Sequence, residues 1–274
     1  MTFKTLHEVD LTCLTKVFNA AFKDYQIPMQ LTENQLSLKL STELYDADLS
    51  VGAFEGDKLV GFILHGFREH RGTRRIYNMG TGVVPDYRGK ALTKRMYEFI
   101  VPSLKKAQID TIQLEVLENN LPAIATYLKI GFKESHLLNC YKGIATTIAS
   151  NVAVDIITSI ETLPASFVVS DFTWQNEVAL INDSNMYLGA FVNGKCVGCL
   201  VLNPAVKRIH YLYVHEDFRR KGIAKSLLNH VIQRHGNDIS AINIHAENKA
   251  LCSFFEALGL GNFIRQYEMK YYLS

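Results

Sequence analysis

The chain has 274 residues, of which 48% are hydrophobic and 20% are charged, and its formal net charge is +2. This composition is typical of a globular protein, and the small net charge argues against a general nucleic-acid binder. No apolar run reaches the roughly 18–20 residues of a membrane span, and the length favours two domains over a single core.

The five cysteines are an odd number and mostly isolated, which indicates a reducing, cytoplasmic setting. The first residues lack the apolar core of a signal peptide, in agreement with that expectation. Cys196 and Cys199 have CxxC spacing, but they lie in a strand-like run without the second pair that a zinc site needs. We expect them to be structural, and we expect no metal.

In the first half, Asp10 or Thr12 caps an amphipathic helix that continues to Ala21, and Thr32 begins a second helix. The following pattern predicts a hairpin, a strand, a helix, a strand, a short helix and a closing strand. These elements are expected at Val51–Phe54 and Leu59–Phe67, Ile76–Val84, Lys94–Lys105, Thr111–Leu117, Leu121–Ile130 and Phe132–Tyr141.

From about Gly143 the same order restarts. The expected elements are Ile144–Ser159, Phe167–Asp171, a short helix from Thr173, the hairpin Tyr187–Val192 and Val197–Asn203, Ile209–Val214, the helix Lys225–Arg234, Ile239–His245, the helix Lys249–Ala257 and Phe263–Tyr272. Asn193-Gly194 is a strong turn signal for that hairpin. The sequence therefore predicts two α+β domains, at residues 1–145 and 146–274.

A basic turn lies between a strand and a helix in both halves, at Tyr87–Thr93 and Phe218–Ala224. Helix starts present unpaired N–H groups and a positive dipole end, and glycine allows an anion to approach the backbone. Val83–Thr93 aligns with Val214–Ala224 without a gap. We interpret the two turns as duplicated phosphate-binding sites.

These residues resemble the GNAT superfamily of acyl-CoA-dependent N-acetyltransferases, in two tandem copies. The second turn matches the family pattern Arg/Gln-x-x-Gly-x-Gly/Ala with Arg219, Gly222 and Ala224, whereas the first has Ala91 and Thr93 at the two small positions. The first copy instead matches the downstream pattern with Asn120, Ala123, Tyr127, Gly131 and Phe132. The second keeps only part of it, with Asn248 and Gly259.

The resemblance implies a mixed sheet that splays open beside its fourth strand, with acetyl-CoA in the gap. The cofactor-binding residues implied in the first copy are Thr81, Gly82, Val83, Arg88, Gly89, Lys90, Ala91, Leu92, Thr93, Lys94 and Asn120. Those implied in the second copy are Leu212, Tyr213, Val214, Arg219, Arg220, Lys221, Gly222, Ile223, Ala224, Lys225 and Asn248. Ala91 is compatible with phosphate binding if its φ stays negative.

The resemblance also implies direct attack by an amine on the thioester, with Tyr127 as the general acid for the leaving thiolate. A phenol donates a proton without carrying charge beforehand; the alternative is a tyrosine that only packs on the sheet. Phe255 has no hydroxyl, so we expect catalysis in the first copy. Glu115 is the candidate base, followed by Glu118 and His65, although a strand glutamate is often merely solvated.

Two other functions stay open. The protein could bind or sense acyl-CoA without turnover, or the second domain could be purely structural. The resemblance does not identify the amine acceptor. The expected partners are acetyl-CoA and an amine, with no nucleic acid or membrane, and the chain is a monomer or a homodimer.

Overall fold

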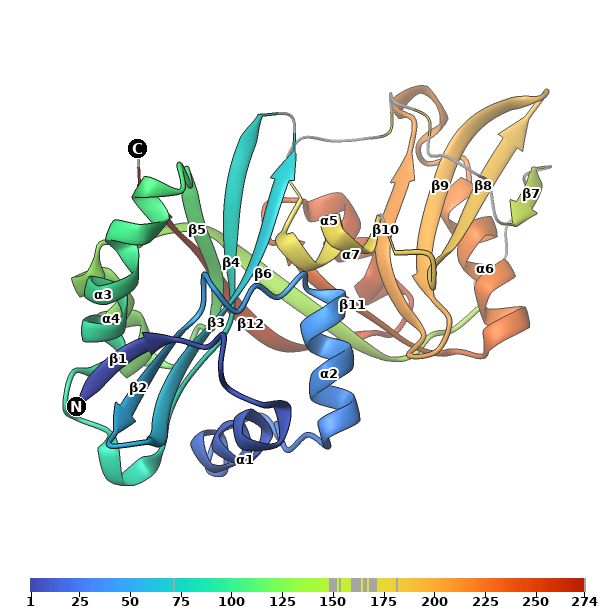
Figure 1. The fold of residues 1–274 in the computed structure, drawn as a ribbon. Coiled ribbons are helices and arrows are strands. Elements are labelled where there is room, and N and C mark those ends of the chain that lie inside the picture. Colours follow the sequence, from blue (N-terminus) through green and yellow to red (C-terminus); the bar gives the residue numbers. More distant parts are fainter. Residues whose placement is uncertain are drawn as a thin grey trace. The chain divides into compact units, whose positions relative to one another are not determined.

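The computed structural model describes residues 1–70, 72–147, 152, 154–158, 164, 167, 172–180 and 182–273. It forms two compact units, one made of Met1–Ser135 with Tyr267–Ser274 and the other of His136–Gln266 (Figure 1). The domain bounds predicted from the sequence repeat, 1–145 and 146–274, stay a prediction. The compact units differ from them because the end of the chain is assigned to the first unit.

The first unit is an α+β structure whose strands lie in the order β1-β2-β3-β4-β5-β12. Its elements are β1 (Thr2–Thr5), α1 (Leu11–Ala21), α2 (Glu33–Thr42), β2 (Val51–Glu55), β3 (Lys58–His70), β4 (Thr73–Val83), α3 (Leu92–Lys106), β5 (Thr111–Leu117) and α4 (Leu121–Ile130). It also contains the last residues of β12 (Gly261–Tyr272). The Gln113 side chain donates to the Glu268 carboxylate at 2.6 Å, which ties the final strand to β5.

Both early helices begin where capping chemistry predicts. The Asp10 carboxylate accepts the Cys13 N–H at 2.7 Å at the start of α1. Thr32 and Gln35 form a reciprocal capping box at the start of α2. The predicted starts of these helices are confirmed.

Successive side chains of β3 point to opposite faces of the first sheet, and each face carries different helices. Phe62 stacks with Phe18 of α1 at a centroid distance of 5.7 Å. Ile63 belongs instead to the core cluster that contains Met96 and Ile100 of α3. Figure 1 accordingly shows α3 and α4 on one side of this sheet and α1 and α2 on the other.

The second unit repeats this order, with strands in the order β6-β11-β10-β9-β8-β7. Its elements are β6 (Lys133–Ile144, which begins in the first unit), β7 (Asp155–Thr158), α5 (Trp174–Ala179), β8 (Met186–Val192), β9 (Lys195–Asn203), β10 (Arg208–Val214), α6 (Ile223–His235), β11 (Asp238–His245) and α7 (Lys249–Ala257). The predicted strand Phe167–Asp171 lies, beyond Phe167, outside the described residues, as do residues 148–151, 153 and 159 of the predicted segment Ile144–Ser159. Leu227, Leu228 and Val231 of α6 fill the core of this unit.

The central parallel strands separate in both units. β4 pairs with β5 only from Arg75↔Thr111 to Tyr77↔Gln113, and β10 pairs with β11 only at Arg208↔Ser240 and Ile209↔Ala241. Just beyond these pairs, each central strand has one extra residue relative to its antiparallel neighbour. It is Met79 of β4 in the pairing with β3, and His210 of β10 in the pairing with β9. The splayed sheet expected from the resemblance is therefore present twice.

In the described part of the chain, no helix is both long and apolar enough to cross a membrane.

Gly66 allows the end of α2 to approach β3, and we predict that Gly66→Ala destabilises the fold. A Cβ at this position would lie 2.1 Å from the Glu43 carbonyl oxygen. The next residue, Phe67, donates its N–H to the Leu44 carbonyl, which holds the two segments together. The expected loss of unfolding free energy is about 2–3 kcal/mol, measured by urea denaturation. Gly80→Ala is the control, because its Cβ would meet only an ordinary contact with Phe18 at 3.8 Å. Equal midpoints for both variants would contradict the prediction.

Candidate functional site

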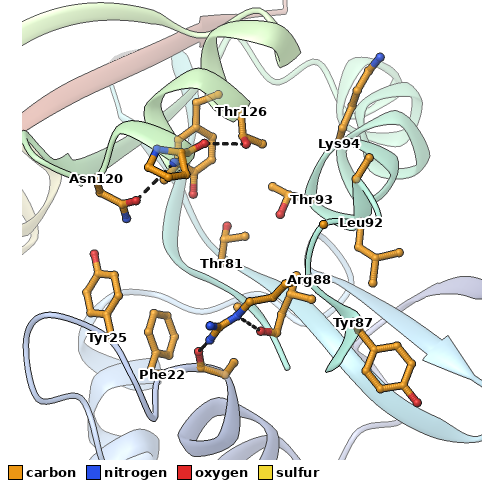
Figure 2. A pocket seen from close by; sticks show the side chains of 18 of the residues that line it. Phe22, Tyr25, Thr81, Tyr87, Arg88, Leu92, Thr93, Lys94, Asn120 and Thr126 are labelled. Atoms are coloured by element: carbon orange, nitrogen blue, oxygen red, sulfur yellow. Dashed lines mark hydrogen bonds between the residues drawn. The ribbon is translucent and has the colours of Figure 1, made fainter. Parts of the chain in front are cut away.

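A cavity of about 660 Å³ opens in the first unit where β4 and β5 diverge. Its lining comes from the end of α1, from β4, from the turn before α3 and from the start of α4 (Figure 2). Figure 2 shows Thr81, Thr93 and Asn120 around this hollow, with Tyr25 on one side. The lining includes Ala21, Phe22, Asp24, Tyr25, Thr81, Gly82, Val83, Tyr87, Arg88, Gly89, Ala91, Leu92, Thr93, Lys94, Asn120, Ala123, Thr126 and Tyr127.

The turn before α3 presents backbone N–H groups to this cavity. Gly89 and Ala91 have φ values of 75° and 54°, on either side of Lys90. The Arg95 N–H donates to the Ala91 carbonyl, so the N–H groups of residues 92–94 have no acceptor within the helix. Such a sequence of amides at a helix start binds anions.

The condition set for phosphate binding at Ala91, a negative φ, is not met. Ala91 is the left-handed N-cap of α3, with φ 54° and ψ 27°. An L-residue with a Cβ pays roughly 1 kcal/mol for this conformation, because the Cβ crowds the neighbouring carbonyl. The N–H of Ala91 is retained, so the methyl group costs stability without removing a donor.

The second turn has the same backbone with the glycine at the other position. Arg220 and Gly222 have φ values of 62° and 89°, and they align with Gly89 and Ala91. Each turn therefore holds one glycine and one non-glycine residue in the left-handed region. The shared backbone supports the interpretation of the two turns as copies.

The motif arginines also have equivalent contacts. Arg88 Nε donates to the Val83 carbonyl at 3.1 Å, and Arg219 Nε donates to the Val214 carbonyl at 3.0 Å. The remaining nitrogens of Arg88 bind the Asp24 carboxylate at 2.6 and 2.7 Å and the Ala21 carbonyl at 2.9 Å. The hydrogen bond from Arg88 lowers the pKa of Asp24. These arginines tie each turn to the end of its preceding strand.

Tyr127 projects from α4 into the cavity and is 9% exposed. Burial is the main cause that raises the pKa of its hydroxyl, and the neighbouring Tyr25 adds to the rise. Hydrogen bonding with Thr81 and Asn78 opposes it. The ring packs edge-on against Phe132 at a centroid distance of 5.4 Å. The phenol is therefore neutral and held in place, as a proton donor must be.

Glu115 lies elsewhere in the first unit. Its carboxylate accepts the Tyr77 hydroxyl at 2.5 Å. The pKa of Glu115 is raised to about 8, chiefly by burial. The Tyr77 hydrogen bond opposes this shift, the charges of Glu268 and Glu43 add to it, and Lys39 opposes it. Such a group exchanges a proton near neutral pH, but in the described structure Glu115 is not among the residues that line the cavity.

A second cavity, of about 470 Å³, occupies the splay of the second unit. His210, Tyr211, Asn176 and Asn248 line it, together with the apolar side chain of Phe255. Burial, together with the charge of Arg208, lowers the pKa of His210 to about 4, so this ring is neutral at physiological pH. The cavity is thus built without a hydroxyl at the place of Tyr127.

The structure brings most predicted first-copy residues together. Among the described residues predicted for that copy, Lys90 and the base candidates Glu115, Glu118 and His65 do not line the first cavity, whereas Tyr127 and the other predicted residues do. In the second copy the predicted set divides. Leu212, Tyr213, Arg219 and Asn248 line the second cavity, and the described residues Val214 and Arg220–Lys225 do not.

The sequence patterns missed Asn78, Tyr97 and Tyr25. Asn78 is 6% exposed, and its amide nitrogen donates to the hydroxyls of Thr81 and Tyr97. Burial raises the pKa of the Tyr25 hydroxyl, and hydrogen bonding with Asn120 opposes this rise. An amide between Tyr77 and Met79, in the buried part of β4, was the available signal for Asn78. Tyr25 follows the end of α1, in a segment without the periodicity that would indicate which way a side chain points.

Fold and site together define a protein with two splayed sheets, each with a turn of two left-handed residues at the start of the following helix, α3 or α6. The model of the acetyltransferase (GNAT) family matches residues 6–132 and again residues 156–260. The chain therefore belongs to the GNAT acetyltransferase family, in two copies, and members of this family use acetyl-CoA.

Related proteins agree with this assignment. The chain is 27% identical over 137 residues to the spermine/spermidine N(1)-acetyltransferase of Bacillus subtilis (strain 168), which covers 46% of this chain and 88% of that protein. A tandem GNAT protein from the clavulanic acid biosynthesis pathway has the same fold, with a TM-score of 0.72 at 12% identity, covering 100% of this chain and 98% of that chain. A GCN5-related N-acetyltransferase from Sphaerobacter thermophilus also gives 0.72 at 12% identity, covering 99% and 95%.

We predict that Ala91→Gly and Arg220→Gly each raise the free energy of unfolding by about 0.5–1 kcal/mol, because glycine relieves the left-handed strain. Gly89→Ala should cost a similar amount, since its Cβ would meet no atom within 4 Å and only φ changes the energy. Urea midpoints measure these shifts. Arg220→Ala is the control for charge, and a gain from it equal to that of Arg220→Gly would contradict the strain argument.

The raised pKa of Glu115 predicts that stability falls as the pH rises. The folded protein holds this proton up to about pH 8, whereas an unfolded glutamate releases it near its ordinary pKa of 4.5. The folded state therefore binds more protons between these values, and unfolding free energy decreases across this window. Glu115→Gln should reduce the pH 5 to pH 8 decrease by on the order of 1–3 kcal/mol, measured by urea denaturation at both pH values. An unchanged slope would contradict it.

Proposed function

We propose that the chain is an N-acetyltransferase that moves an acetyl group from acetyl-CoA to a primary amine, in its first repeat. The observation that carries the proposal is one cavity that joins an anion-binding helix start to a buried, neutral tyrosine hydroxyl. Family membership supports the donor, acetyl-CoA.

The pyrophosphate of the donor lies on the N–H groups from Gly89 to Lys94, with Lys90 contributing charge beside them. The pantetheine arm runs along Thr81–Val83, which the lost pairing with β5 leaves accessible at the cavity. Asn120, whose side chain caps α4 by accepting the Ala123 N–H at 3.3 Å, lies at the other wall. This arrangement places the thioester near Tyr127.

The reaction is a direct displacement through a tetrahedral adduct. The amine nitrogen bonds to the acetyl carbon, the carbon–sulfur bond breaks, and the sulfur takes the proton of the Tyr127 hydroxyl. The phenolate regains a proton from solvent. The proton lost by the amine passes to water. Glu115, proposed as a base through water, takes it only in the ionised fraction of the protein, because a pKa of about 8 keeps most of these carboxyl groups protonated at neutral pH.

The second repeat takes no part in the chemistry under this proposal. Phe255 stands where Tyr127 stands in the first repeat, and a phenyl ring has no proton to donate. Its turn, Arg219–Lys225, keeps the backbone of an anion site and is proposed to bind phosphate or to serve structure alone. A polyamine is the first acceptor to test, because bacterial relatives are named for spermine and spermidine.

The experiment measures thiol release from acetyl-CoA with polyamines, aminoglycosides, amino acids and peptides as acceptors. Tyr127→Phe should lower kcat about 100-fold or more with the best acceptor and leave acetyl-CoA binding by calorimetry unchanged. Tyr187→Phe is the matched control, since its hydroxyl lies in the second unit. No thiol release with any amine, with acetyl-CoA still bound, would favour a sensing protein instead.

A further inference from the structure

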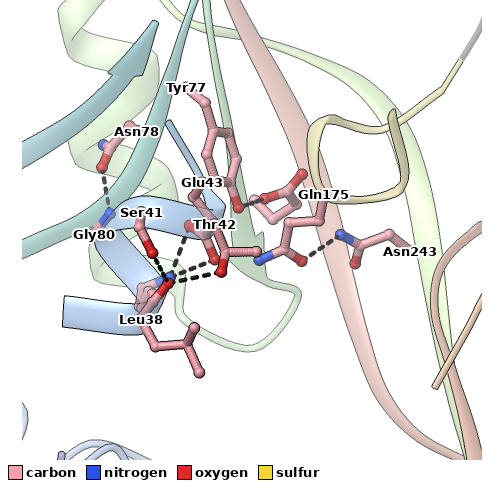
Figure 3. A network of polar contacts seen from close by, with 11 residues as sticks. Leu38, Ser41, Thr42, Glu43, Tyr77, Asn78, Gly80, Gln175 and Asn243 are labelled. Carbon is pink, nitrogen blue, oxygen red and sulfur yellow. Dashed lines mark hydrogen bonds and ion pairs between the residues drawn. The ribbon is translucent and has the colours of Figure 1, made fainter. Parts of the chain in front are cut away.

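The extra residue in β4, Met79, leaves the backbone next to it without a regular partner, and the Asn78 side chain replaces that pairing. The Asn78 Oδ1 atom accepts the Gly80 N–H at 3.0 Å (Figure 3). This bond fixes the orientation of the amide, because only the oxygen can accept from a backbone N–H.

The Asn78 nitrogen then has two protons, and the structure provides an acceptor for each. It lies 2.7 Å from the Thr81 hydroxyl oxygen and 2.9 Å from the Tyr97 hydroxyl oxygen. Asn78 is 6% exposed and Tyr97 is 1% exposed, so water competes little for these bonds. The Asn78 amide therefore fixes the positions of the Thr81 and Tyr97 hydroxyls and of the backbone beside the extra residue Met79.

The Thr81 hydroxyl accepts from Asn78, so its own proton is left to donate to another atom. Thr81 and Tyr127 line the same cavity, from β4 and from α4. Hydrogen bonding from Thr81 is also the largest influence that lowers the pKa of Tyr127. The amide thus leaves the Thr81 proton to donate at the cavity that Tyr127 also lines.

We infer that Asn78 and Thr81 are positioning residues for the proton donor of the first repeat: the amide orients the Thr81 hydroxyl, which donates to the Tyr127 oxygen and stabilises the phenolate as the proton leaves. The inference rests on the proposed role of Tyr127. Under this inference, the two residues affect how readily Tyr127 gives its proton to the departing thiolate, and they leave the affinity for acetyl-CoA unchanged.

The second repeat supplies an internal comparison. It keeps the same strand irregularity at His210 and the same turn, but the positions aligned with the four polar residues are all apolar. Asn78, Thr81, Tyr97 and Tyr127 correspond to Ile209, Leu212, Leu228 and Phe255. Since the bulge persists without the amide, the polar set is not required to build the fold; it is present where the proton donor is present.

The test is kinetic, with the acceptor that gives the fastest thiol release. Thr81→Val should lower kcat about tenfold with an unchanged KM for acetyl-CoA, since one hydrogen bond to a charged group is lost. Thr81→Ser, which keeps the hydroxyl, should restore kcat to within about twofold. In a Tyr127→Phe background, Thr81→Val should cause no further loss, because both changes remove one function.

Thr15→Val is the matched control: it deletes a buried hydroxyl that bonds to the Leu11 carbonyl at 2.7 Å, outside the cavity. Wild-type kcat in Thr81→Val, or a full additional loss in the double variant, overturns the inference while leaving the proposed function intact. Wild-type kcat in Tyr127→Phe overturns the proposed role of Tyr127 and the inference with it.

A second measurement does not require activity. Urea midpoints of Thr81→Val, Tyr127→Phe and the double variant form a cycle in which a hydrogen bond between the two hydroxyls gives a non-additive shift. Additive midpoints would show that the two groups do not interact, and would overturn the inference even if no acceptor is found.

Discussion

The candidate site depends on the point at which β4 and β5 stop pairing. Parallel strands normally bond to each other throughout their length, and here the pairing ends at Tyr77↔Gln113. The later residues of β4 are then left at a cavity, and the helix that follows starts at the same edge of the sheet. The constraint is backbone geometry, and the side chains that line the gap act within it.

Duplication separates that geometry from the chemistry. Both copies keep the diverging strands, the extra strand residue, the two left-handed turn positions and the arginine bonded to the strand end. They differ in the side chains around the gap. The first has an amide and hydroxyls and the second has aliphatic and phenyl groups. A shared scaffold thus carries a polar set at four positions of the first copy and apolar residues at the four aligned positions of the second.

The sequence predicted the order of elements well, because apolar periodicity, caps and the Asn-Gly turn are local signals. β5 and α4 begin and end at their predicted residues. The left-handed φ of Ala91 could not be predicted, since alanine rarely adopts it and the surrounding turn imposes it. The contact of Asn78 with Tyr97 and the pairing of Glu115 with Tyr77 also depend on long-range packing, for which the sequence carries no periodic signal.

The placement of the chain's last strand has a consequence for how the first unit folds. Gln113 and Glu268, which bond at 2.6 Å, are 155 residues apart in the chain, and Met269 and Leu273 belong to the first unit's core cluster. During synthesis the first repeat emerges long before these residues do. Its sheet therefore has an open edge beside β5 until the second repeat is made. Such distant closure slows folding, and it couples the first repeat to complete translation of the second.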